Sequence, residues 1–235
     1  MSCVPTLLPP TTRWGWPILY RNQGDGTFAD VALQTGVAYT EDGRAQAGMG
    51  SDAGDYDGDG FLDLITTNFD EDISMLYRAA PSGNFSDISY RAGLGENTTY
   101  LGWGTDFFDY DNDGDLDIFV NNMGDSPSLF ENRGGNQGSF LTVRTRGTAS
   151  NRDGIGAKIM MTAGGRKQFK EVRAGSSFLS QSDLRLHFGL GEAEQVDLLE
   201  VWWPSGKTQS FKDIPANQFL TVTEGEGISQ WPVTR

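Results

Sequence analysis

The sequence is poor in the residues that carry nucleophilic and acid–base chemistry. Among 235 residues there is one cysteine, Cys3, and one histidine, His187. A single cysteine excludes an internal disulfide framework and a thiolate metal cage. The chain also lacks an apolar run near the roughly 20 residues that a membrane helix needs, and it has no G-x-S-x-G motif. These absences argue against a disulfide scaffold, a membrane-spanning protein and a serine hydrolase.

Lysine is missing from the whole first part of the chain, where acidic residues accumulate. The formal net charge is −14; residues 1–140 carry 22 acidic and 6 basic side chains, whereas residues 141–235 carry 10 and 12. Because phosphate backbones require a basic face, nucleic acid is excluded as a partner. An acidic, glycine-rich first half indicates either high solubility or a bound cation.

The acidic part contains an internal repeat. The segment DYDGDGFLD at 55–63 recurs as DYDNDGDLD at 109–117, and GMGSD at 48–52 recurs as GWGTD at 102–106. The runs between them are short and bounded by Gly, Asn, Asp or Pro, which is typical of strands separated by turns. The expected strands are 62–67, 74–78, 85–90, 116–121 and 128–131. About four short strands in each repeat fit a propeller blade.

After a Gly/Asn-rich linker at 132–138, the sequence remains β-patterned but becomes poor in acidic residues. The expected strands here are 140–146, 157–163, 170–174, 184–188, 196–203 and 219–224. We therefore divide the chain into a linker or artificial start without a strand (1–17), blades (18–138), a small β domain (139–225) and a tail (226–235).

The expected fold class is all-β: a partial β-propeller of about two blades plus incomplete ends, followed by a small β-sandwich or barrel-like domain. Two blades cannot close a ring that usually takes four to eight. The sequence therefore predicts either that upstream blades are missing or that the blades pack open on a partner.

Each acidic nonapeptide has Asp at positions 1, 3, 5 and 9 and Gly at position 6. Alternate side chains of a tightly curled loop converge on one centre, and Ca²⁺ takes six to eight oxygen ligands. Glycine permits the sharp turn, and the backbone carbonyl at position 7 completes the set. The predicted ligands are Asp55, Asp57, Asp59, the carbonyl of Phe61 and Asp63 in the first loop, and Asp109, Asp111, Asp113, the carbonyl of Asp115 and Asp117 in the second.

Other interpretations of the nonapeptides fit less well. An EF-hand needs a bidentate Glu at position 12, where this chain has Thr66 and Val120. Mg²⁺ prefers a rigid octahedron with several waters. Polar β-turns rich in Asp and Gly are the remaining alternative, but the closely spaced carboxylates in two copies would repel one another without a cation. Ca²⁺ is therefore the predicted cofactor.

These residues resemble known families. The blocks GDYDGDGFLDLITTN at 54–68 and FDYDNDGDLDIFVNN at 108–122, with LYRNQGDGTFADV at 19–31, are similar to FG-GAP/VCBS repeats. That resemblance implies a calcium-binding β-propeller of the integrin α-subunit type over about 18–133. In the second half, SNRDGIGA at 150–157, SQSD at 180–183, LHFGLG at 186–191 and WPSG at 203–206 resemble the ASPIC/UnbV domain of cartilage acidic protein-like proteins.

The remaining candidates have mainly structural interpretations. His187 lies on an expected strand between two apolar residues, which is typical of a buried structural histidine. Trp202 and Trp203 point to opposite faces of their strand, and an exposed tryptophan could stack on a sugar. No catalytic residue is predicted.

We therefore expect a non-catalytic, calcium-binding, extracellular or cell-surface binding or adhesion module, forming the C-terminal part of a longer propeller protein. Its ligand would be a protein or a glycan. Extracellular calcium sites bind at about 10⁻⁴–10⁻³ M and would be empty in cytosol, so the periplasm, cell surface or exterior is expected although no signal peptide is recognisable. The alternative is a polysaccharide-active enzyme or an accessory carbohydrate-binding module, because paired carboxylates also serve glycoside hydrolysis.

Overall fold

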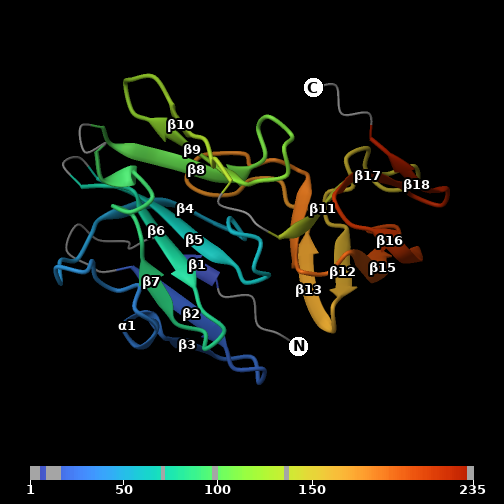
Figure 1. The fold of residues 1–235 in the computed structure, drawn as a ribbon, viewed down its shortest axis with the longest axis horizontal. Helices are drawn as coiled ribbons and strands as arrows, with labels where there is room; N and C mark the ends of the chain where they lie inside the picture. The colour runs from blue at the N-terminus through green and yellow to red at the C-terminus, as the bar shows by residue number, and fades with distance from the viewer. Residues whose placement is uncertain (1–5, 9–16, 70–71, 97–99, 135–137, 232–235) are drawn as a thin grey trace.

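The computed structural model describes residues 6–8, 17–69, 72–96, 100–134 and 138–231, and these residues form an all-β protein (Figure 1). Their strands are arranged in five sheets. Helical structure in the described ranges is limited to α1 (Ala32–Thr35) and a 3-10 turn at Leu94–Glu96. Cys3 lies outside the described residues.

The N-terminal part contains three antiparallel sheets, which we call the N-terminal sheets. The first has the order β1-β2-β3, the second β4-β5-β6-β7 and the third β10-β9-β8. Their strands are β1 (Thr6–Leu8), β2 (Ile18–Asn22), β3 (Phe28–Asp30), β4 (Gly48–Gly54), β5 (Asp63–Asn68), β6 (Met75–Ala79), β7 (Phe85–Asp87), β8 (Gly102–Phe108), β9 (Asp117–Asn122) and β10 (Ser128–Phe130).

Repeated sequence folds into repeated structure in the second and third sheets. The pairs β4–β5 and β8–β9 are antiparallel, and each ladder ends in equivalent partners, Gly54 with Asp63 and Phe108 with Asp117. Each nonapeptide therefore connects two paired strands at the same end of its sheet. Apolar side chains such as Leu64 and Ile118 are buried between the sheets and hold these ladders in place.

The C-terminal part, which we call the C-terminal sandwich, consists of two four-stranded sheets around one core. The orders are β14-β11-β17-β18 and β13-β12-β15-β16, and β11 pairs with β17 in parallel. Leu141, Ile159, Phe188 and Trp203 are fully or almost fully buried in this core. The strands are β11 (Ser139–Arg146), β12 (Lys158–Ala163), β13 (Arg166–Glu171), β14 (Leu186–Gly191), β15 (Gln195–Trp202), β16 (Thr208–Pro215), β17 (Gln218–Thr223) and β18 (Gly227–Gln230).

Several boundaries differ from those expected from the sequence. The start 1–17 was expected to contain no strand, but β1 pairs with β2; its other residues up to 16 lie outside the described residues. The tail expected at 226–235 contains β18, which pairs with β17, so the sandwich extends beyond residue 225. The expected strands also include none at β2, β3, β4, β8 or β16, and β13 begins before the expected 170–174.

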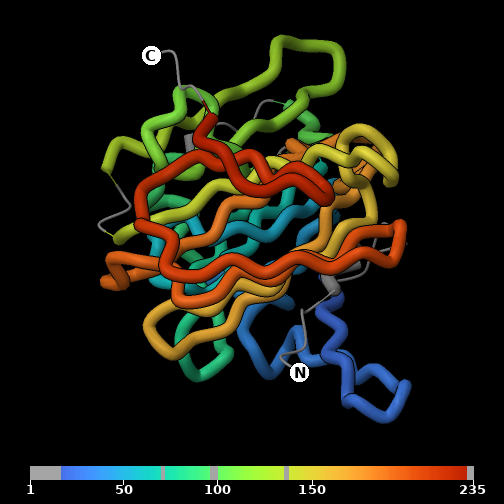
Figure 2. Tube along the Cα trace, turned by 90° about the vertical axis from the view of Figure 1, so that its right-hand side faces the viewer, coloured from blue at the N-terminus to red at the C-terminus, as the bar shows by residue number. Residues whose placement is uncertain are grey.

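The C-terminal sandwich packs beside the N-terminal sheets, at the ends where the nonapeptides lie. Figure 2 shows the C-terminal strands, in orange and red, in front of the N-terminal ones. Hydrogen bonds join the two parts directly, including Gly191 N–H to Gly58 O at 3.0 Å and Thr105 N–H to Ser177 Oγ at 3.0 Å. The rings of Trp103 and Phe178 also meet across this boundary, with centroids 4.6 Å apart.

Candidate cation sites

Two loops carry the predicted ligands. Loop 1 (55–63) joins β4 to β5, and loop 2 (109–117) joins β8 to β9. Both turn sharply at the glycine in position 6, where φ is +85° for Gly60 and +101° for Gly114. Because side-chain-bearing residues rarely adopt such angles, glycine is required there.

Each loop brings three carboxylates together. One oxygen of each of Asp55, Asp57 and Asp63 lies within 4.8 Å of the others, and Asp109, Asp111 and Asp117 form an equivalent group. The first and last members are buried in both loops, with exposures of 1% for Asp55 and 0% for Asp63. Six of the eight aspartates predicted to bind through their side chains are therefore gathered in two groups.

The remaining predicted ligands lie outside these groups or contribute through the backbone. Asp59 and Asp113 accept hydrogen bonds from the N–H groups of Phe61 and Asp115, each at 2.9 Å. Both carboxylates are thus engaged in turns of their own loops. Their role as ligands stays a prediction, as does that of the carbonyl groups of Phe61 and Asp115.

Backbone amides hold the buried carboxylates in the same way in both loops. Gly60 N–H donates to Asp55 Oδ2 at 2.7 Å, and Gly114 N–H donates to Asp109 Oδ2 at 3.0 Å. The last aspartate of each loop accepts an amide from its own loop. It also accepts one from a later segment, Ala79 N–H at 2.8 Å for Asp63 and Asn132 N–H at 2.8 Å for Asp117.

The electrostatic state of the groups suits a hard cation. Burial raises the pKa of Asp55 to about 7, that of Asp63 to about 8 and that of Asp109 to about 7. Asp55 Oδ1 is buried and has no hydrogen-bond partner among the described residues, and leaving such an atom unsatisfied costs about 1–3 kcal/mol or more. An all-oxygen donor set that is buried and rich in carboxylates fits Ca²⁺. Bound there, calcium would supply positive charge and cross-link the loop.

The two loops differ in one neighbouring charge that sequence reasoning missed. Arg78 Nη2 lies 2.6 Å from Asp57 Oδ2 and 3.9 Å from Asp59 Oδ2. Arg78 precedes Ala79, whose amide holds Asp63, and in loop 2 the residue that precedes the equivalent Asn132 is Glu131. Extending the alignment of the two repeats to these positions would have shown that Arg78 in the first repeat is replaced by Glu131 in the second.

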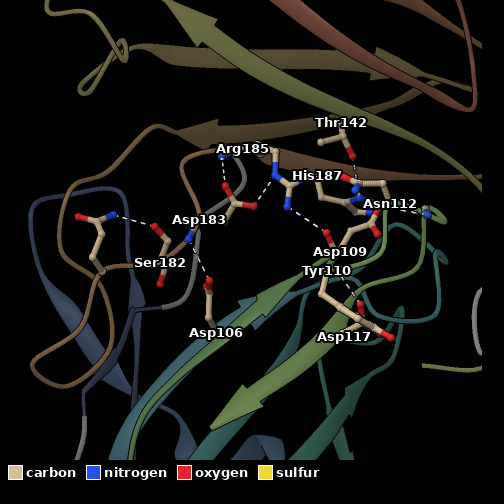
Figure 3. A network of polar contacts seen from close by, with 12 residues as sticks. Asp106, Asp109, Tyr110, Asn112, Asp117, Thr142, Ser182, Asp183, Arg185 and His187 are labelled. Carbon is tan, nitrogen blue, oxygen red and sulfur yellow. Dashed lines mark hydrogen bonds and ion pairs between the residues drawn. The ribbon is translucent and has the colours of Figure 1, made fainter. Parts of the chain in front are cut away.

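The C-terminal sandwich contributes two arginines that the motifs did not reveal. Arg185 donates to Asp109 O at 2.9 Å and to Asn112 Oδ1 at 2.8 Å, and its Nε is paired with Asp183 (Figure 3). Arg166 donates to Asp59 O. Both arginines therefore contact the backbone of a cation loop.

His187 is buried, as expected from the sequence. It is 6% exposed, its Nδ1 lies 3.1 Å from Thr142 Oγ1, and its ring stacks on Phe140. Burial lowers the pKa of His187 to about 3, so the ring is neutral at physiological pH. Trp203 is buried as well, whereas Trp202 is half-buried.

A polar cavity of about 270 Å³ lies between the N-terminal sheets and the sandwich. Asp52, Asp106, Lys170 and His187 are among its lining residues. Burial raises the pKa of both aspartates, that of Asp106 to about 7.

The fold and these sites define a class of protein in which FG-GAP-like repeats precede an ASPIC and UnbV domain. The FG-GAP-like repeat model matches residues 11–66 and 55–120, and the ASPIC and UnbV model matches residues 147–229. The chain belongs to this class. No helix among the described residues has the length and apolar character needed to cross a membrane.

Curated relatives have the same order of domains. Cartilage acidic protein 1 of Xenopus tropicalis is 26% identical over 270 residues, which cover 87% of this chain and 40% of the relative. The Homo sapiens protein of that name is 24% identical, with 88% and 40% covered. The chain thus spans 40% of the length of these relatives. A solved structure of a putative cell adhesion protein from Bacteroides ovatus is 12% identical and covers 93% of this chain and 80% of its own, but its TM-score of 0.23 supports no argument.

Proposed function

We propose that this chain is a calcium-binding, non-catalytic module of an extracellular or cell-surface adhesion-like protein. The observation that carries the proposal is the pair of equivalent loops, each with three converging carboxylates and a buried first and last aspartate. The FG-GAP-like repeats and the similarity to cartilage acidic protein 1 support an adhesion-like role outside the cytosol. The calcium ions would be structural.

In this proposal the N-terminal sheets are blades of a β-propeller. The four-stranded sheet β4–β7 is one blade, β8–β10 is a second, and β1–β3 is the outer part of a third. The blades (β1–β10) and the C-terminal sandwich (139–230) would be separate domains, and further blades of a longer protein would close the ring. The proposed ligand is a protein or a glycan on a surface outside the cell.

Calcium would act on folding through charge. Without a cation, burial forces each loop either to keep its carboxylates protonated or to separate them, since like charges in one site repel. A bound Ca²⁺ would compensate the charge of Asp55, Asp57 and Asp63 in loop 1, and of Asp109, Asp111 and Asp117 in loop 2. The loops would then hold the paired strands at their ends.

A polysaccharide-active enzyme is the second candidate, because the polar cavity contains two carboxyl groups with raised pKa values. Both carboxyl groups accept backbone hydrogen bonds, Asp52 Oδ2 from the N–H of Phe107 and Asp106 Oδ2 from the N–H of Asp183, each at 2.9 Å. This geometry supports a non-catalytic role for the pair.

The proposal is tested by thermal unfolding across a calcium titration, with EGTA and magnesium controls. At ten times Kd each site adds about 1.4 kcal/mol, so two sites raise the melting temperature by roughly 6–10 °C. The double variant Asp57→Asn/Asp111→Asn should lose this rise. Asp42→Asn/Asp125→Asn, which changes two exposed aspartates outside the loops, should keep it. A folded wild-type protein whose melting does not respond to calcium would refute calcium binding.

A further inference from the structure

The C-terminal sandwich covers both cation loops. At loop 1, Gly191 N–H donates to Gly58 O at 3.0 Å, and Gly189 lies so close to Asp55 that a β-carbon there would collide with its carboxylate. At loop 2, a β-carbon on Gly114 would collide with the ring of Phe140. The surface on which the sandwich rests is therefore formed in part by the loops themselves.

At loop 2 the contact consists of a chain of hydrogen bonds centred on Arg185 (Figure 3). Its guanidinium group bonds both to the carbonyl of Asp109, the first predicted ligand, and to the side chain of Asn112. Asn112 has a φ of 61°, in the left-handed region that asparagine adopts more readily than most residues. Asp183, which pairs with Arg185, donates its own N–H to Asp106 Oδ2 at 2.9 Å.

Arg185 and Asp183 carry opposite charges and are paired with each other inside this network. Arg185 is 16% exposed and Asp183 is 22% exposed, so both lie within the interface. Because Asp183 compensates the positive charge of Arg185, the arginine affects loop 2 mainly through the fixed fork of its donors. A lysine at the same place would keep the charge but lose this planar, bidentate geometry.

Loop 1 is held from the same side. Arg166 donates to Asp59 O, and its guanidinium carbon lies 5.5 Å from the ring centroid of Phe61. The sandwich thus contacts the backbone of position 5 in loop 1 and of position 1 in loop 2. A change in the shape of either loop must move atoms that the sandwich contacts.

We propose that cation binding at the two loops and docking of the C-terminal sandwich are thermodynamically linked, with Arg185 and Arg166 as positioning residues. In the cation-bound state the loops have the shape that these arginines recognise. Without the cation, repulsion among the carboxylates opens the loops and weakens the docking. Linkage is reciprocal, so an undocked sandwich lowers the affinity for the cation by the same factor. This inference rests on the proposed calcium sites.

Hydrogen–deuterium exchange of the full chain, in calcium and in EGTA, tests the linkage without any substitution. The N–H groups of Thr105, Asp183 and Gly191 donate across the interface. We expect peptides that contain them to exchange at least about tenfold faster in EGTA. Peptides from the β15–β16 ladder, inside the sandwich, serve as the control and should keep their protection.

A calcium-binding isotherm tests the reciprocal effect. Arg185→Lys should raise the Kd of one site about fivefold or more, in the usual range of coupling between sites. Arg152→Lys is the matched control, because Arg152 is exposed and pairs with Asp153 outside the loops. An unchanged or lower Kd for Arg185→Lys would show that the arginine does not position loop 2.

The outcomes distinguish the linkage from the proposed function. If the wild-type protein binds calcium but its interface peptides exchange equally fast in calcium and EGTA, the linkage is wrong and the calcium sites stand. If the isotherm shows no calcium binding, both proposals fail. The linkage is supported if only the interface peptides exchange faster in EGTA and if Arg185→Lys binds calcium more weakly than the wild type.

Discussion

The exchange of Arg78 for Glu131 between the two repeats predicts that the two cation sites differ in affinity. Arg78 is paired with Asp57 at 2.6 Å, so calcium entering loop 1 must compete with a guanidinium group for that carboxylate. Loop 2 has an acidic residue at the equivalent place. We expect the site in loop 2 to fill first, and Arg78→Gln to tighten the site in loop 1.

The size of the effect follows from the geometry of this ion pair. Ca²⁺ lies about 2.3–2.6 Å from its ligand oxygens, and Arg78 Nη2 lies 2.6 Å from Asp57 Oδ2. A calcium ion bound to that oxygen would lie at most about 5 Å from Arg78 Nη2. Arg78 is 51% exposed, so the dielectric constant of water applies, and the repulsion is about 1.7 kcal/mol before screening. Salt at physiological ionic strength roughly halves this value, and loss of the exposed pair adds about 0.2–1 kcal/mol. The sum of about 1–2 kcal/mol corresponds to roughly a tenfold change in Kd.

Calorimetric titration in a background that silences loop 2 measures this difference. In Asp111→Asn, the remaining isotherm reports loop 1, and Arg78→Gln should lower its Kd about tenfold. Arg44→Gln in the same background is the control, since the side chain of Arg44 is exposed and pairs with Asp42, outside the loops. The gain should shrink at high salt, because screening weakens the repulsion. If Arg78→Gln left the Kd unchanged or raised it, the assignment of Arg78 as a competitor of calcium would be refuted.

Two further predictions concern stability away from the cations. Burial raises the pKa of Glu224, but hydrogen bonds, including those from the amides of residues 148–150, outweigh it and lower the pKa to about 2. This carboxylate therefore stabilises the fold above about pH 4.5 and loses its effect as the pH falls towards 2. In urea unfolding between these pH values, the free energy of unfolding of Glu224→Gln should fall less with acid than that of the wild type. The same pH dependence in both proteins would contradict this prediction. Gly50→Ala should lower stability by about 1–3 kcal/mol, because its β-carbon would collide with the carbonyl oxygen of Trp103. Thermal melting checks this against Gly227→Ala, where nothing lies within 4 Å, and equal melting points for the two variants would contradict it.

Period-two patterns and turn residues located most strands, and they failed where packing overrides local preference. The strand β4 has the sequence GMGSDAG, and glycine is normally unfavourable within a strand. Gly50 and Gly54 are required because a β-carbon at either would collide with the neighbouring sheet, at Trp103 and at Phe107. The strands β1 and β18 were missed for another reason, since both are short strands at sheet edges.

The spacing of the nonapeptides was sufficient to locate the candidate sites, because a loop of nine residues largely determines which of its own side chains converge. It could not indicate what surrounds the loops. Arg185 lies 76 residues after Asp109, and Arg166 lies 107 residues after Asp59, so no local pattern connects them. Arg78 and Glu131 lie closer but outside the motif. The motif thus predicts the class of ligand, whereas tertiary contacts with non-motif residues would set the affinity of each proposed site and its coupling to the sandwich.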